Sequence, residues 1–331
     1  MADLSTSYLG LKLKNPLIAA SSPLTATLDN LKRCEDAGLG AVVLKSIFEE
    51  QIEAAGEKTA DHGEAYSAHT DAYEFLREAS KERHIDAYLA LVEDAKQALD
   101  IPVIASINCR SNGKWIEYAK RFSAVGADAI ELNHYVVATD VEVDGVEVEK
   151  EYLSLVKSVR KALGLPLSLK MSPAFSSLAN MLRRFDEAQI DGVVLFNRFY
   201  NPDINIERMQ MVPASMLSGK DEYTLSMRWA ALMSPQVRYD ICTSTGIWDG
   251  KTVIKQLLAG AKCVQLCSVL LKQGLSTVFK IESEIGQWME ENGYESIDEF
   301  RGKLSHEHAD PMTWERVQYV KSILDADTRK E

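Results

Sequence analysis

The sequence predicts an α/β fold, a closed (β/α)8 TIM barrel. Strand-like and helix-like segments alternate along almost the whole chain, and short apolar runs end in polar residues. Glycines recur where the helical segments stop. Such alternation implies parallel strands joined by helical crossovers. Eight βα units favour a closed barrel over an open sheet, and 331 residues is an ordinary length for one.

The predicted elements begin with a small hairpin over residues 4–13, which we expect to cover the bottom of the barrel. Eight apolar runs follow as buried parallel strands, because strands covered on both faces read as continuous apolar segments. These predicted strands are 17–20, 41–45, 102–107, 128–133, 166–170, 192–196, 237–242 and 262–266.

Helical patterns lie between these strands. Apolar residues recur at three- and four-residue spacing, as in Leu153, Val156, Val159 and Leu163. Several patterns stop at a glycine suited to the left-handed C-cap, such as Gly38. The predicted helices are 27–37, 84–99, 114–125, 150–163, 175–188, 224–233 and 249–259.

The remaining segments are a tail and three long connections. After residue 268 the pattern predicts helix to about residue 325, so a helical extension of about 285–331 completes a single domain over 1–331. The polar connections 46–83, 134–149 and 198–223 are expected on the active face, as lids or substrate contacts.

Composition and charge exclude several classes of function. A net charge of -12 argues against nucleic acid and membrane partners. The five cysteines have no metal or cluster spacing, so we expect no metal and reduced thiols. The N-terminus has no signal-peptide pattern, and no apolar run approaches the ~20 residues of a membrane span. We therefore expect a soluble, cytoplasmic protein.

Four strands end in a group that binds anions or amides: Lys45, Asn133, Lys170 and Asn197. The carboxyl ends of barrel strands meet at one face, so these groups should converge there. A buried lysine is costly unless an anion or carbonyl meets it, which predicts a polar, negatively charged ligand. Alternatively, Lys170 extends its ammonium to solvent and the two asparagines cap turns.

The last two βα units have the pattern of a phosphate site. Thr245-Gly246 follows the seventh strand, and Cys267-Ser268 follows the eighth just before a helix. Backbone N–H groups at glycine turns and helix N-termini bind phosphate oxygens. Aldolases, epimerases and flavoenzymes all place phosphate there in this fold, so the pattern alone does not choose among them.

Seven motifs, in order within residues 4–280, resemble the dihydroorotate dehydrogenase family. The family binds FMN without a covalent bond, and the resemblance implies the same here. The motifs are Asn15-Pro16-x-x-x-Ala20-Ser21-Ser22, Lys45-Ser46, Glu131-Leu132-Asn133, Leu169-Lys170-x-x-Pro173, Leu217-Ser218-Gly219, Thr245-Gly246-Ile247 and Ala259-Gly260-Ala261-x-x-Val264-Gln265.

The resemblance also implies roles for particular residues. Lys170 would lie beside the N1–C2 edge of the flavin and stabilise charge there, and Asn133 and Asn197 would face flavin or substrate. The other cofactor contacts that it implies are Ala20, Ser21, Lys45, Ser46, Ser218, Gly219, Thr245, Gly246, Cys267 and Ser268. A possible homodimer is implied in the same way.

The chain departs from the family pattern around the substrate. Val136 stands where the family has its Cys or Ser base, and the family's Asn-x-x-Gly loop is missing from residues 61–76. His134 and Tyr135 are substitute candidates for proton transfer, unless this loop is merely packed. Arg198 is a candidate for a substrate carboxylate, or else a surface-loop residue.

The leading hypothesis is an FMN-dependent oxidoreductase of pyrimidine metabolism. It would transfer hydride between flavin and a small dihydropyrimidine-like substrate. One alternative is a lyase or epimerase that acts on a phosphorylated substrate with Lys170 as a Schiff-base lysine. The other is a non-catalytic flavin-binding protein, which Val136 at the base position suggests.

Overall fold

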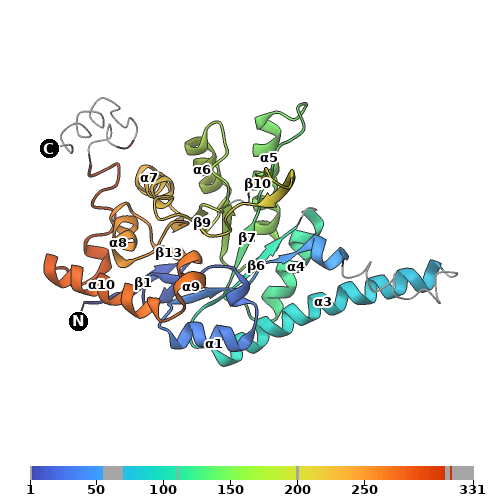
Figure 1. Cartoon of the computed structure of the whole chain (residues 1–331), viewed down its shortest axis with the longest axis horizontal. Helices are drawn as coiled ribbons and strands as arrows, with labels where there is room; N and C mark the ends of the chain where they lie inside the picture. Colours follow the sequence, from blue (N-terminus) through green and yellow to red (C-terminus); the bar gives the residue numbers. More distant parts are fainter. Residues whose placement is uncertain (1, 55–69, 110–111, 199–200, 310–313, 315–331) are drawn as a thin grey trace.

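The computed structural model describes residues 2–54, 70–109, 112–198, 201–309 and 314 (Figure 1). Within them, eight parallel strands form a closed ring, because β13 pairs with β3 and β4 pairs with β6. The predicted barrel is confirmed. Its strands are β3 (Leu17–Ala19), β4 (Ala41–Val43), β6 (Val103–Asn108), β7 (Ala129–Asn133), β8 (Leu167–Met171), β9 (Gly192–Leu195), β12 (Asp240–Ser244) and β13 (Cys263–Leu266).

Helices surround the ring (Figure 1). Several begin at a side-chain cap, as where Asp144 accepts a hydrogen bond from the N–H of Glu147. Their apolar faces pack against the outward side chains of the strands, such as Leu167 and Leu169. The helices are α1 (Leu28–Asp36), α3 (Thr70–Ala98), α4 (Asn112–Ala124), α5 (Gly145–Ala162), α6 (Leu178–Glu187), α7 (Tyr223–Met233), α8 (Gly250–Leu258), α9 (Ser268–Gln273) and α10 (Thr277–Asn292). None of them, as far as the chain is described, is both long enough and apolar enough to cross a membrane.

The N-terminal hairpin closes the bottom of the barrel, as predicted. Strands β1 (Thr6–Tyr8) and β2 (Leu11–Leu13) are antiparallel. The wholly buried Tyr8 packs with the inward residues at the amino end of the strands, among them Val43 and Ile104. The N–H of Leu9 donates to Asp240 Oδ2 at 2.8 Å. The hairpin therefore leaves the carboxyl end of the barrel as its open end.

Strand alternation sorts the side chains of each strand into two layers. In β8, Leu167, Leu169 and Met171 belong to the core shared with the helices, whereas Ser168 and Lys170 face the barrel interior. The same parity applies along every strand of the ring. It decides which predicted side chains reach the mouth.

The fold differs from the prediction in element bounds, in strands within the loops and in the C-terminal extension. Helix α3 begins at Thr70, inside the predicted connection 46–83 and before the predicted helix 84–99. Strand β12 extends two residues beyond the predicted 237–242, because the chain stays buried and paired to Ser244. The loops contain extra strands, β5 (Ile47–Phe48) and the hairpin of β10 (Pro202–Asn205) with β11 (Gln210–Pro213). These strands are only two to four residues long and are defined by their pairing.

The third difference is the C-terminal extension. Helix α10 ends at Asn292, where Gly293 takes a left-handed φ of 73° as its C-cap. Residues 293–309 then run in turns, with one 3-10 turn, η3 (Ile297–Glu299), so this part is not the predicted helix. Residues 310–313 and 315–331 of the predicted extension lie outside the described residues.

Candidate functional site

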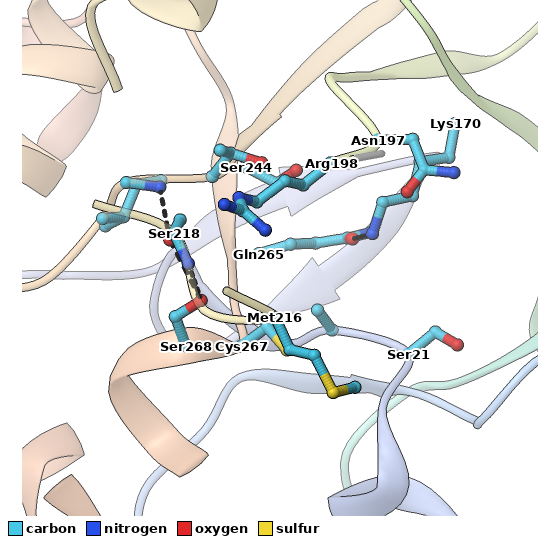
Figure 2. Close-up of a pocket in the computed structure, with 14 residues that line it drawn as sticks. Ser21, Lys170, Asn197, Arg198, Met216, Ser218, Ser244, Gln265, Cys267 and Ser268 are labelled. Carbon is cyan, nitrogen blue, oxygen red and sulfur yellow. Dashed lines mark hydrogen bonds between the residues drawn. The ribbon is translucent and has the colours of Figure 1, made fainter. Parts of the chain in front are cut away.

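A cavity opens at the carboxyl ends of the strands, and we call it the mouth cavity (Figure 2). Ala20, Lys170, Asn197, Ser244 and Gln265 come to its wall from five different strands or strand ends. Its volume is ≈160 Å³, and it adjoins a side cavity of ≈390 Å³. Together they match the ~300–1,000 Å³ of small-molecule sites.

The Lys170 side chain forms part of the wall of the mouth cavity. It is buried on the inward face of β8, and its Nζ donates to Gln265 Oε1 at 2.9 Å. Gln265 comes from the middle of β13 and in turn donates through Nε2 to Glu131 Oε2 at 2.5 Å. A polar chain therefore links the ammonium to a carboxylate in the barrel interior.

Glu131 is the acidic residue at the inner end of this hydrogen-bonded chain. The sequence alone indicated no role for it in the site. It is 0% exposed on β7. Burial raises the pKa of Glu131, and the Lys170 charge and the Gln265 hydrogen bond oppose this shift. Strand parity was the available signal, because Glu131 is two residues from Asn133 and therefore faces inward with it.

A group of polar turns from three segments lies across the mouth cavity from Lys170 (Figure 2). Ser218 precedes α7, Gly246 follows β12, and Ser268 begins α9. Ser218 N and Oγ both bond to Ser268 Oγ, at 2.9 and 3.0 Å, and the N–H of Gly246 donates to Ser218 Oγ at 3.1 Å. Gly246 has a φ of +74°, and a Cβ there would lie 2.2 Å from the backbone nitrogen of Tyr223. Only glycine fits this turn, which gathers N–H and hydroxyl groups of the kind that bind an anion.

Of the other residues predicted to bind phosphate, some line the mouth cavity and one does not. Thr245 and Cys267 line the mouth cavity, and burial raises the pKa of the Cys267 thiol, which keeps it neutral. Gly219 does not line it, because its N–H points to the Glu222 carboxylate at 2.5 Å.

The predicted asparagines are brought together. Asn197 Nδ2 donates to Asn133 Oδ1 at 2.8 Å, and Asn133 Nδ2 donates to Ser46 Oγ at 3.2 Å. Ser46 is also 3.0 Å from Ser21 and 2.7 Å from Ser106, oxygen to oxygen. This network joins four of the predicted site residues along one side of the mouth.

Arg198 lies between the two cavities and lines both. Its Nε donates to Glu222 Oε2 at 3.0 Å, and its Nη1 donates to the carbonyl of Ser215 at 2.8 Å. Tyr135 lines the side cavity. The guanidinium and the phenol therefore border the same space, where they could contact a second ligand.

Five of the predicted site residues line neither cavity: Lys45, Ser46, Asn133, His134 and Gly219. Lys45 is exposed, so the predicted contact of its ammonium with a ligand is not supported by the structure. His134 turns outward from Asn133 and is buried between Trp115 of α4 and Tyr152 of α5, with ring centroids 5.7 and 4.4 Å away. The structure therefore does not place His134 where it could act as the predicted catalytic base.

The electrostatic state of His134 agrees with this position. Its Nε2 is 3.4 Å from Glu151, but Glu151 is about half exposed, and burial dominates by lowering the pKa of His134 to about 4. The ring is neutral near pH 7. Within the described ranges, no group of three or more His, Cys, Asp or Glu residues could hold a metal ion.

Comparison with known proteins adds the family. The family model for dihydroorotate dehydrogenase matches residues 3–289. The catalytic subunit of dihydroorotate dehydrogenase B (NAD(+)) from Thermoplasma acidophilum is 26% identical, over 91% of this chain and 99% of that protein. The Pyrococcus abyssi counterpart is 27% identical, over 90% and 98%. The NAD-dependent dihydropyrimidine dehydrogenase subunit PreA of Escherichia coli K12 is 24% identical, over 91% and 76%.

Proposed function

The chain belongs to the dihydroorotate dehydrogenase family, a family of oxidoreductases, and we propose that it is FMN-dependent. The proposed reaction is hydride transfer between the flavin and a small dihydropyrimidine-like substrate. One observation carries the proposal: a buried ammonium and an anion-binding turn face each other across one cavity. The names of the similar proteins support a pyrimidine-related substrate.

The residues present fit FMN. Ser218, Gly246 and Ser268 would hold its phosphate, because their N–H and hydroxyl groups can exchange internal hydrogen bonds for phosphate oxygens. Bound FMN supplies a two-electron acceptor whose N1–C2 edge gains negative charge on reduction. Lys170 would stabilise that charge, since its ammonium is fixed in advance in a site of low dielectric.

The side cavity would take the substrate. Arg198 presents a guanidinium suited to a carboxylate or carbonyl, and Asn197 presents an amide. Tyr135 replaces His134 as the candidate for holding or moving a proton, because Tyr135 lines the side cavity and His134 lines neither cavity. Val136 is partly buried against the core and offers no proton-transfer group.

The geometry weakens the Schiff-base alternative. A Schiff-base lysine must attack as a neutral amine, whereas Lys170 donates to the Gln265 oxygen and has the carboxylate of Glu131 behind it. A non-catalytic flavin protein is the stronger second candidate, because the loop after β7 presents neither Val136 nor His134 as a base.

Two measurements test the proposal. The purified protein should show a flavin absorption spectrum, or gain one on incubation with FMN; failure of both would refute FMN dependence. Anaerobic stopped-flow mixing with dihydroorotate and dihydrouracil should then bleach the flavin. Bound FMN that no dihydropyrimidine or NAD(P)H reduces would favour the non-catalytic candidate.

Arg198→Ala sharpens the substrate test. If Arg198 binds a substrate carboxylate, the variant should lose rate with dihydroorotate and keep its rate with dihydrouracil, which lacks the carboxylate. An equal loss with both would assign Arg198 to the Glu222 ion pair alone. Cytoplasmic location and a homodimer stay predictions, to be checked by cell fractionation and light scattering.

A further inference from the structure

Glu131 is a buried charge that the proposed reaction does not use. Its carboxylate lies inside the barrel, and its direct partner is the amide of Gln265 rather than a cation. The second oxygen, Oε1, has no hydrogen-bond partner among the described residues. Burying a carboxylate in this way is costly, so its presence calls for a compensating interaction.

Lys170 supplies that compensation through Gln265. An ammonium can only donate hydrogen bonds and an ionised carboxylate can only accept them. The amide between them therefore has one allowed orientation, with Oε1 toward Lys170 and Nε2 toward Glu131. A flipped amide would present its NH2 group to the ammonium and its oxygen to the carboxylate, and both contacts would be repulsive.

Other ionisable groups inside the barrel do not replace this pair. The phenols of Tyr8, from the hairpin, and Tyr88, from α3, both interact electrostatically with Glu131. Burial raises the pKa of both phenols, so they are neutral near pH 7. Lys170 and Glu131 are thus the opposite charges that face each other across Gln265.

We propose that Glu131 is a positioning residue that orients Gln265 and holds Lys170 as an ammonium directed at the mouth cavity. This inference rests on the proposed function for its consequence, since the ammonium would face the flavin. The role of Glu131 toward Lys170 can also be tested in the protein without cofactor. Glu131 would act on the Lys170 ammonium through Gln265, without touching Lys170 or a ligand.

The first test uses the protein without cofactor. The pKa of Lys170 is measured by NMR with ¹³C-labelled lysine, and Lys170→Arg identifies the signal. In Glu131→Gln, the pKa of Lys170 should fall by about one to two units, because a buried compensating charge is lost. An unchanged pKa in a folded variant would overturn the proposal.

A double variant controls for misfolding. Glu131→Gln combined with Gln265→Glu keeps the charge count and moves the carboxylate into direct contact with Lys170. The pKa of Lys170 should then equal or exceed that of the native protein. A fall as large as in the single variant would contradict the proposal, because it would show that packing rather than charge sets the pKa.

The second test uses the protein with FMN bound. Glu131→Gln should shift the flavin midpoint potential to a more positive value, since removing a nearby negative charge favours the anionic reduced state. The double variant should shift it the other way, and equal potentials in all three proteins would overturn the link to the flavin. If the native protein binds no FMN, the proposed function fails, while the cofactor-free titration still decides the role of Glu131.

Discussion

The two halves of the barrel mouth are built differently. The β12–β13 half, with Ser218, Gly246 and Ser268, is a set of tight turns whose backbone and hydroxyl groups bond to one another. The β4–β7 half depends on side chains just after the strands, where the long loops begin. There Lys45 is exposed and His134 packs against helices. Tight backbone turns tolerate few amino-acid substitutions, whereas loop side chains can be substituted without disturbing the barrel. Under the proposed function, the first half could keep a cofactor site while the second changes its substrate.

The strongest test of this difference is Gly246→Ala. The new Cβ would meet the backbone nitrogen of Tyr223 at 2.2 Å, in a left-handed conformation that Ala adopts poorly. We expect a loss of about 3 kcal/mol in unfolding free energy and no measurable FMN binding. Urea unfolding and flavin fluorescence titration measure the two effects.

Its matched control is Gly286→Ala in α10, where a Cβ meets nothing within 4 Å. This variant should be neutral or more stable by ~0.5–1 kcal/mol, because alanine favours helix. If Gly246→Ala behaved like this control, the β12–β13 turn would not be as constrained as its geometry implies.

Alanine substitution of the two lysines, Lys170 and Lys45, compares their contributions to FMN binding directly. Lys170→Ala should weaken FMN binding by about 10- to 100-fold, the ~1.5–3 kcal/mol of a hydrogen bond to a charged group. Lys45→Ala should change it less than about two-fold, because an exposed ammonium gains little from a ligand contact. Isothermal titration with FMN measures both variants. Equal losses would show that Lys45 joins the site when ligand binds.

His134 gives the loop half a pH dependence of stability. Its pKa is about 4 in the folded chain against an ordinary 6.5, so the unfolded chain binds the proton more readily. Stability should therefore be complete above about pH 6.5 and fall by about 2 kcal/mol as the pH drops to about 5. His134→Phe keeps a ring between Trp115 and Tyr152 but cannot be protonated, so this contribution should vanish.

Urea unfolding of both proteins at several pH values checks this expectation. The His134→Phe protein should also keep the pH profile of flavin reduction, since His134 lies outside both cavities. A changed profile would return His134 to the list of proton-transfer candidates.

Among the variants expected to weaken FMN binding measurably, Ser268→Ala should have the smallest effect. It removes the hydroxyl that accepts the N–H of Ser218, and should cost about 1 kcal/mol of FMN binding, roughly five-fold. Ser283→Ala, at an exposed position of α10, is the control and should leave affinity unchanged. A loss of 100-fold would mean that this one hydroxyl, rather than the turn as a whole, holds the phosphate.

The sequence predicted the barrel well because most of its strands are short, largely apolar runs that alternate with helical patterns. The β10–β11 hairpin escaped notice because its residues are mostly exposed and carry no such run. Pairing between strands, which the sequence does not display, creates it.

The sequence indicated which residues line the mouth cavity where residue type fixes the geometry. Gly246 and Lys170 are examples, since one needs a left-handed turn and the other an inward position on a buried strand. The position of His134 was not predicted, because its acid/base chemistry was considered without strand parity. Asn133 faces inward, so its neighbour faces the helices, and the same parity identifies Glu131 as an interior residue.

The hairpin at the chain's N-terminus gives the barrel a blind end. Tyr8 and Leu13, both buried, fill the space beneath the strands, and the polar chain from Lys170 to Glu131 lies above them. Removing or displacing these first strands would hydrate the interior and weaken every charge interaction within it. A truncation or fusion there would thus act on the mouth from the opposite pole of the molecule, without touching a residue of the cavity.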